Sequence, residues 1–486
     1  MIRKPDKYLV LIFALLGFLP VSAAGIVGSK EPGYNTSDSV PVHASPGHLF
    51  EIGKIYINGN RVTRGYIIER ELPFRSGDSL TLTEITRSFT RIRERLINTR
   101  LFNEATVSLQ EFRGFTIDLR IDVKERWYIF PLPYVRPVDR NFTAWADQHY
   151  SLKRFDYGLK YSHYNFTGRN DFLRIWLITG YTRQVELAYD QPNMGRQLKH
   201  GFGFGFKYAG QKELNVITTA NKQVFVNRDS LANAGKFLRE DLNFSLRYYY
   251  RPGLRTHHLV RFSFNHIKID STVGNYNPQY LLNDKKSIFF PELSYTLRYN
   301  NIDYVPYPTR GFFAEGSLLK RGITADMDMW QLNAKTSEAF SFAPKMFLVS
   351  ENLGMIRVPF KQPFYNKQLL GYNDFYMRGL ERYVVDGVAC VTARNTVLRE
   401  LARFSVPFLR GTSHDQIPFH IYAKAYFDLG YVYDKYNNVN SLVNRGLYSG
   451  GFGIDVVTFY DFVFRAEFSM NQLGEKGFFF HIRNDF

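Results

Sequence analysis

Apolar and polar side chains alternate one by one in many stretches of the chain between about residue 155 and Phe486. The alternation is regular in residues 202–208, 242–250 and 293–300, where Phe, Leu and Tyr occupy every second position. Because successive side chains of a β-strand point to opposite faces, each stretch has one apolar and one polar face. A soluble sandwich covers such apolar faces with a second sheet, whereas a membrane barrel turns them to lipid. The pattern therefore predicts strands and leaves two architectures to separate.

The length of the β region favours the barrel. No strong helical periodicity follows Trp127, and breaks rich in Gly, Asn and Pro punctuate residues 127–486, for example at 168–170, 192–195 and 252–253. At roughly 22 residues per strand and connection, about 16 strands fit, so we expect a mainly β fold with a 16-stranded antiparallel transmembrane β-barrel. A soluble sandwich of that length would be unusual.

A small α+β domain is expected before the barrel, at residues 48–126. Residues 49–57 are typical of a strand, 63–72 of a short helix, and 105–110 and 115–123 of a hairpin. A clearer helix begins after Thr81, which forms a capping box with Glu84. Its core-facing side chains recur at helical spacing: Leu82, Ile85, Phe89, Ile92 and Leu96.

The N-terminus has the features of an export signal. Basic residues precede an apolar run at 8–20, and small residues at 21–24 offer a cleavage site. The run has about 13 residues, too few for a membrane-spanning helix, which disfavours an uncleaved anchor. We assign residues 1–24 to a signal peptide and the Gly-, Ser- and Pro-rich residues 25–47 to a flexible leader.

Composition agrees with an exported membrane barrel. Aromatic residues reach 17%, as suits the aromatic girdles at the membrane surfaces. The formal net charge is +17, but the basic residues are spread over the polar faces of strands, so no nucleic-acid partner is expected. Lumen carboxylates, outer-membrane lipid head groups or an acidic chain passing through are the expected partners of this charge. Cys390 is the only cysteine, which excludes an intrachain disulfide.

Signatures of enzymes, cofactors and metals are poor. No Gly-x-Ser-x-Gly nucleophile elbow occurs. The glycines at 201–205 alternate with phenylalanine and precede no helix, which favours a strand over a phosphate loop. His257 and His258 are adjacent, so on a strand they point to opposite faces and do not share a metal. We therefore expect no catalytic residue, no cofactor and no metal site, and hence no enzyme.

Residues 48–126 resemble the polypeptide-transport-associated (POTRA) domain. The resemblance rests on the element order, on Ile-Tyr-Ile-Asn-Gly-Asn at 55–60, and on the residues at 77–78 and 99–102. It implies a periplasmic domain that binds client chains or partner proteins along a strand edge, by pairing an extended peptide with exposed backbone groups. A domain that only spaces or plugs the barrel is the alternative.

The sequence Phe-Tyr-Met-Arg-Gly-Leu at 375–380 resembles the loop motif of the outer-membrane assembly-factor and two-partner-secretion superfamily, also called bacterial surface antigen barrels. Residues 426–433 are similar to the strand of that family that carries an inward Asp. The family usually has Val or Ile before Arg-Gly and Phe or Tyr after it, so two positions depart but stay apolar. The lumen-loop motif of this chain consists of Met377, Arg378, Gly379 and Leu380.

In that family the loop folds back into the barrel, and its arginine pairs with carboxylates of the inner wall. The resemblance therefore implies that Arg378 bonds Asp428, with Glu400 as a second candidate partner. The alternative is an arginine in an extracellular turn and an aspartate at a strand end.

Two further passages fit the same family. Residues 300–312 resemble one of its strand-turn-strand segments. The C-terminus resembles the signal by which outer-membrane barrels are recognised for insertion, although Asn484 departs from the usual apolar residue. The positions that carry this signal are Gly477, Phe480, Ile482 and Phe486.

Together these features imply an outer-membrane protein of a Gram-negative-type bacterium with its N-terminal domain in the periplasm. The resemblance implies that it assembles, inserts or translocates client polypeptides without nucleotide hydrolysis. Outer-membrane lipid and periplasmic or lipoprotein partners are the other partners that it allows. The alternatives are a passive porin or receptor, and a surface antigen with long extracellular loops such as 213–236.

Overall fold

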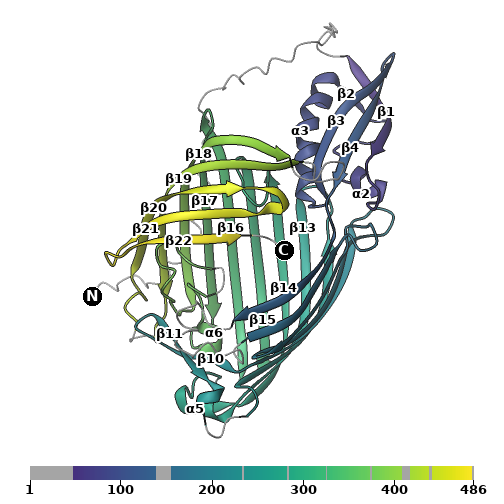
Figure 1. Cartoon of the computed structure of the whole chain (residues 1–486). Helices are drawn as coiled ribbons and strands as arrows, with labels where there is room; N and C mark the ends of the chain where they lie inside the picture. The colour runs from purple at the N-terminus through teal and green to yellow at the C-terminus, as the bar shows by residue number, and fades with distance from the viewer. Residues whose placement is uncertain are drawn as a thin grey trace, which may run out of the picture.

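A computed structural model describes the chain in eight segments, which are residues 48–137, 155–231, 235–281, 284–324, 326–372, 375–407, 416–436 and 440–483. A small N-terminal domain is followed by a large antiparallel sheet that curves around a lumen (Figure 1). The expected signal peptide and leader lie outside the described residues. Among the helices of the described segments, none is long and apolar enough to cross a membrane.

The N-terminal domain packs its helices against a four-stranded sheet. Its elements are β1 (Leu49–Asn58), α2 (Gly65–Glu69), β2 (Ser79–Thr81), α3 (Leu82–Asn98), β3 (Phe102–Arg113) and β4 (Thr116–Glu125). The sheet order is β2-β1-β4-β3, so β3 is an edge strand. Ile85 and Ile92 of α3 are fully buried in one core with Ile52 and Ile117 of the sheet. Thr81 and Glu84 form the expected capping box at the start of α3.

The helix expected at 63–72 is shorter than predicted. Only Gly65–Glu69 is helical, because the preceding residues are held in a loop around Glu125. The Glu125 carboxylate accepts hydrogen bonds from the backbone N–H groups of Val62 and Thr63, at 3.0 and 2.6 Å. A carboxylate from a distant strand therefore decides where this helix begins.

The barrel sheet has sixteen strands in the described segments, which confirms the predicted fold class. They are β5 (Ile129–Pro137), β6 (Phe155–Tyr164), β7 (Phe172–Gly180), β8 (Arg183–Met194), β9 (His200–Gln211), β12 (Arg239–Tyr250), β13 (Thr256–Ile269), β14 (Ser287–Ile302), β15 (Gly311–Thr324), β16 (Met327–Ala343), β17 (Met346–Val358), β18 (Ala389–Pro407), β19 (Gln416–Tyr433), β20 (Gly446–Val457), β21 (Val463–Asn471) and β22 (Lys476–Arg483). Each strand pairs antiparallel with the next one in this order.

Side chains alternate between lipid and lumen as the sequence predicts. Phe206, Phe244 and Phe264 lie side by side on β9, β12 and β13, and each is between 38% and 43% exposed on the outer face. One position along, Ser245 and Ser263 face the lumen and are buried. The outer face is therefore apolar without a covering sheet, as a membrane barrel requires.

One rim of the barrel is covered by a hairpin, which occupies much of the loop expected at 213–236. It consists of β10 (Glu213–Thr219) and β11 (Lys222–Asn227), followed by the 3-10 turn η2 (Arg228–Ser230). Val216 and Val226 pack in a buried cluster with Val273 of α5 (Ser271–Tyr276) and Phe364 of α6 (Phe364–Lys367). The expected long loop is thus folded onto the barrel.

The N-terminal domain is bound to the turns at the opposite rim. Glu71 accepts two hydrogen bonds from Arg251 of the β12–β13 turn, at 2.6 and 2.7 Å. Arg126 bonds both carboxylate oxygens of Asp461, at 2.9 and 3.1 Å, in the turn η4 (Phe459–Asp461) before β21. Asn98 at the end of α3 donates to the carbonyl oxygen of Ile302, at 3.1 Å. Several bonds to different turns hold the domain in one position.

The two ends of the barrel sheet are β5 and β22, and within the described residues no backbone pairing joins them. Tyr164 N donates to Tyr128 O, which sets the hydrogen-bonded positions of the β5–β6 pair. Since these positions alternate along an antiparallel pair, the odd-numbered residues of β5 direct their backbone groups away from β6. Pro131 and Pro133 belong to this set and have no N–H to offer.

The free edge of β22 differs from that of β5. Asn471 N donates to Glu475 O, so the even-numbered residues of β22 direct their N–H and C=O groups away from β21. These residues include Phe478, Phe480 and Ile482, whose side chains are 73%, 79% and 68% exposed. The seam therefore lies between the β22 edge, which is rich in donors, and the β5 edge, where Pro131, Pro133 and Pro137 leave three donors missing.

The ion pair that docks the N-terminal domain should respond to acid in a defined range. Burial alone would raise the pKa of Glu71, but the Arg251 guanidinium, through charge and hydrogen bonds, and Arg70 bring this pKa below the usual value of 4.5. Docking should thus be intact above pH 4.5. It should weaken as the pH falls through the pKa that Glu71 has in the folded protein, which is below 4.5. The strength of docking at each pH can be measured by amide hydrogen exchange of the residues at the junction.

The substitution Glu71→Gln should weaken docking at neutral pH by about 3–5 kcal/mol and remove the acid transition, because it leaves a buried guanidinium unpaired. Glu69→Gln is the matched control, since Glu69 is exposed. A docking loss that already begins between pH 7 and 6, or a Glu71→Gln variant that behaves like the control, would contradict this assignment.

Candidate functional site

The connection between β17 and β18 folds into the lumen. Leu370 and Val385 pair in an isolated β-bridge that closes the loop on itself. The buried side chains of the loop, including Met377 and Leu380, form one apolar cluster with Val432 of the barrel wall. A resident loop therefore occupies the lumen beside β18, β19 and β20.

Arg378 is the polar anchor of this loop. It is 4% exposed, and its Nε donates to Asp428 Oδ2 at 2.9 Å while Nη2 donates to Oδ1, so the two side chains form a bidentate pair. Nη1 donates to the Thr396 hydroxyl at 2.9 Å, and the guanidinium carbon lies 3.9 Å from the ring centroid of Tyr426. The guanidinium is thus engaged with side chains of both β18 and β19.

The neighbours of Arg378 explain why the motif needs its particular residue types. Gly379 has φ +80°, and a Cβ there would lie 3.2 Å from the Ser469 Cβ, so a small residue with a left-handed backbone is required. Met377 packs on Gly430, where a Cβ would lie 2.7 Å from the Met377 sulfur. Leu380 is 3% exposed.

Glu400, the second expected partner of Arg378, lies elsewhere. It bonds Arg403, with both nitrogen–oxygen distances at 3.0 Å. Arg394, not Glu400, lies opposite Asp428 in the β18–β19 register, which places Glu400 six residues and about 20 Å farther along the strand. The sequence did not reveal Thr396, because its role follows from this register alone.

The C-terminal signal positions lie on β22 where the structure describes them. Phe480 and Ile482 share the outward face, whereas Gly477 lies on the alternate, lumen-facing set of positions. Phe486 lies outside the described residues.

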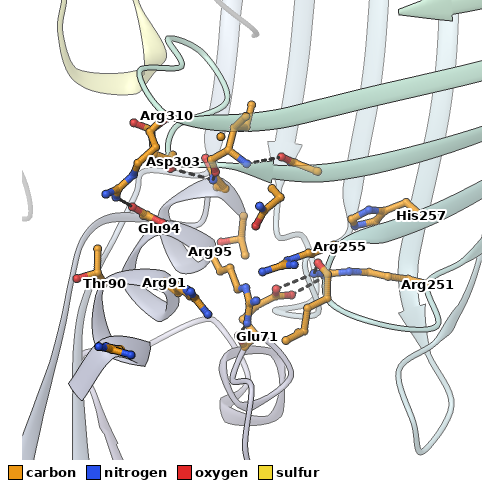
Figure 2. A pocket seen from close by; sticks show the side chains of 18 of the residues that line it. Glu71, Thr90, Arg91, Glu94, Arg95, Arg251, Arg255, His257, Asp303 and Arg310 are labelled. Atoms are coloured by element: carbon orange, nitrogen blue, oxygen red, sulfur yellow. Dashed lines mark hydrogen bonds and ion pairs between the residues drawn. The ribbon is translucent and has the colours of Figure 1, made fainter. Parts of the chain in front are cut away.

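A second site, which the sequence did not indicate, lies between α3 and the barrel rim. We call it the junction cavity; it has a volume of about 960 Å³. Figure 2 shows its charged side chains converging from both sides. The charged residues that line it are Glu71, Arg87, Arg91, Glu94, Arg95, Arg251, Arg255, Asp303 and Arg310. No motif could have revealed it, since these residues come from segments up to about 240 positions apart.

One group in the described residues has the side chains to hold a divalent cation. Glu381 of the lumen loop, Glu467 of β21 and His481 of β22 place ligand atoms within 4.8 Å of one another. His481 Nε2 lies 3.5 Å from a carboxylate oxygen of each glutamate. Lys424 Nζ, 2.6 Å from Glu467, already balances one of these charges.

Removing the arginine of the buried pair should destabilise the barrel. Arg378→Ala removes the bidentate partner of the buried Asp428 and leaves it only Arg394, whose Nε lies 3.7 Å from Oδ2, so the loss should be about 3 kcal/mol. The double variant Arg378→Ala with Asp428→Asn should recover part of this loss, because the buried carboxylate charge is removed together with its main partner. Arg382→Ala, an exposed position on the same loop, is the control. Denaturant unfolding of the purified barrel measures the differences, and equal stability of Arg378→Ala and the control would contradict them.

Gly379→Ala should destabilise the loop by about 1–3 kcal/mol, the cost of a left-handed backbone in a residue with a Cβ. The loop should then exchange its amide hydrogens faster while the strands keep their protection. Gly316→Ala in β15 is the matched control, since no atom lies within 4 Å of its Cβ position. Unchanged exchange in Gly379→Ala would show that the loop tolerates another conformation.

Two protein families match this chain. Residues 50–126 match POTRA, described as a surface antigen variable number repeat, and residues 165–458 match the Omp85 superfamily domain. The second match covers more than half of the sequence. No curated protein sequence matches the chain closely enough to count as a relative.

Solved structures with a similar trace include BamA from Haemophilus ducreyi lacking POTRA domains 1–3. It is 16% identical, with a TM-score of 0.48, over 89% of this chain and 84% of that one. CdiB from Acinetobacter baumannii is 12% identical, with a TM-score of 0.47, over 90% and 73%. CdiB from Escherichia coli is 8% identical, with a TM-score of 0.47, over 92% of each chain. From the family matches, the chain belongs to the Omp85 superfamily and is an outer-membrane β-barrel protein with a periplasmic POTRA domain.

Proposed function

We propose that this protein inserts or translocates client polypeptides at the outer membrane, without nucleotide hydrolysis, by pairing extended client strands with β22 at the barrel seam. The observation that carries the proposal is the pair of unjoined edges, β5 and β22, in an otherwise continuous sheet. The alternative from the sequence is a passive porin, receptor or surface antigen.

The physical reason is the cost of unpaired backbone groups in lipid. Each N–H or C=O without a partner in the hydrocarbon layer costs several kcal/mol. At Phe478, Phe480 and Ile482, the backbone N–H and C=O groups of β22 point away from β21, toward the free edge of the sheet. A partner strand from a client would satisfy them.

The first strand is a poor partner for this edge. Pro131, Pro133 and Pro137 remove three donors from the β5 edge, so β5 and β22 form an incomplete ladder if they pair. A client strand with a full set of N–H groups forms a better ladder with β22 than β5 does. The prolines thus favour an exchangeable seam over a closed one.

The POTRA domain offers a second place for an extended chain. Its edge strand β3, which contains Leu109, is unpaired on one side in the sheet order. Strand addition at this edge would collect clients or periplasmic partners with little demand on their side chains. Since bonds to the periplasmic turns hold the domain in place, a chain collected there would be delivered at the barrel mouth.

The lumen loop supports transport more than free diffusion. Arg378 and the cluster around Met377 fill the lumen beside β18–β20, which weighs against a wide and permanently open pore. Single-channel recordings separate the two functions, because a passive porin conducts steadily, whereas a barrel with a resident loop is closed or flickers as the loop moves.

Photo-crosslinking at the seam tests the proposal. A photoreactive residue in place of Phe480 should capture client polypeptides in intact cells, because the β22 edge is free. The same residue in place of Phe264 should capture none, because β13 is paired on both sides and Phe264 is equally apolar and lipid-facing.

Equal capture at the two positions, or none at Phe480, would reject the seam as the client site. Depletion of the protein followed by proteomics of the outer membrane then tests the function itself. Loss of particular barrels or surface proteins identifies the clients, and an unchanged outer-membrane proteome would reject the proposed function.

A further inference from the structure

We propose that the junction cavity binds a carboxylate-rich segment of an extended polypeptide at the periplasmic mouth of the barrel. This inference rests on the proposed function in so far as the polypeptide is a client. It adds a charge preference and a location that neither the seam nor the β3 edge provides.

The cavity has two walls of different origin. One wall is the exposed face of α3, and the other consists of the β12–β13 and β14–β15 turns with the adjoining strand ends (Figure 2). The volume of about 960 Å³ lies at the upper end of the range of ligand pockets. It therefore has room for several residues of an extended chain.

The acidic residues of the lining are already engaged. Glu71 is paired with Arg251, and Glu94 accepts a hydrogen bond from Arg310 at 2.8 Å. Asp303 accepts hydrogen bonds from the backbone and hydroxyl of Thr309 in its own turn, at 3.0 and 2.5 Å. These contacts are made with partners other than Arg87, Arg91, Arg95 and Arg255.

Six arginines and three carboxylates line the cavity, so it has an excess of three positive charges. Within the part of the chain that the structure describes, no salt bridge is formed by Arg87, Arg91, Arg95 or Arg255. Arg87, Arg91 and Arg95 are spaced four residues apart on α3, so they lie on one face of the helix. Arg93 of the same helix is exposed and does not line the cavity.

The arginines repel one another. Burial lowers the pKa of Arg95, Glu71 opposes this shift, and the guanidinium groups of Arg255, Arg251 and Arg91 lower the pKa further. A bound carboxylate would relieve this repulsion, and guanidinium groups grip carboxylates through two hydrogen bonds.

The position of the cavity favours a polypeptide over a lipid head group. His257 and Asn300 belong to the lumen-facing positions of β13 and β14, because Tyr295 and Leu297 on the alternate positions of β14 face outward. The POTRA helix α3 covers the other side. The arginines therefore line the inner mouth of the barrel, away from the lipid that contacts the outer face.

The test measures binding of a fluorescent peptide to the full-length protein in nanodiscs. An extended peptide rich in Asp and Glu should bind, and a matched peptide with Asn and Gln at those positions should not. The double variant Arg87→Gln with Arg91→Gln should weaken binding of the acidic peptide by about tenfold, because two exposed charge partners are lost. Both side chains are exposed on α3, so the variant should fold normally.

Arg93→Gln is the matched control, and its affinity should equal that of the unaltered protein. Added salt should weaken binding of the acidic peptide to the unaltered protein, because it screens these partly exposed charges. Unchanged affinity in the double variant, or equal binding of the uncharged peptide, would overturn the proposal. Tighter binding of a short-chain phosphatidylglycerol through the same two arginines would assign the cavity to a lipid head group and overturn it as well.

The result of the peptide-binding test can be distinguished from the result of the crosslinking test of the proposed function. Loss of peptide binding in the double variant with no client captured at Phe480 would leave the acidic-peptide site standing while the seam function fails. Client capture at Phe480 with no preference for the acidic peptide would support the seam function and reject the acidic-peptide site.

Discussion

The structure depends on one constraint, which is that backbone N–H and C=O groups in the membrane need hydrogen-bond partners. Fourteen of the sixteen barrel strands meet it through two neighbours, and only β5 and β22 have one neighbour within the described residues. The alternating side chains, the even number of strands and the antiparallel order all follow from satisfying this requirement with a single curved sheet. The seam is where the requirement is unmet, so it is also where a second chain can add most stability.

The barrel is held in its particular form by buried charge pairs between segments far apart in the sequence. Arg378 and Asp428 fix the lumen loop to the wall, and Glu71 with Arg251 fixes the POTRA domain to the rim. Such pairs are demanding, since each charge is costly when it is alone in a site of low dielectric constant. They therefore specify one arrangement of loop, domain and barrel more strongly than they add stability.

The arginines of the junction cavity contrast with these pairs. Arg378 is enclosed by a carboxylate, a hydroxyl and an aromatic ring, whereas Arg87 and Arg91 face an open cavity and form no salt bridge within the described residues. The same side chain thus has a structural role in one place and remains available for a ligand in the other. A part of the net positive charge of the chain is thus concentrated at this mouth.

The sequence by itself determined what depends on local periodicity. The alternation of apolar residues indicated the strands and their lipid face, and the spacing after Thr81 indicated α3 with its cap, because both follow from the repeat of a single element. The resemblance of the loop motif also pointed to Asp428 as the partner of Arg378. Local reasoning failed where a distant residue intervenes: Glu125 delays the start of α2, and the β18–β19 register carries Glu400 away from Arg378.

Only the tertiary structure decided the seam and the junction cavity. Pro131 and Pro133 read as ordinary strand residues until the β5–β6 register shows that they face the free edge. From the sequence alone, Arg87 and Arg255 are expected to be solvated surface charges. The docked domain places α3 beside the β12–β13 turn, so both residues line one cavity. Register and docking depend on contacts between residues far apart in the chain, and no pattern within a single strand or helix contains that information.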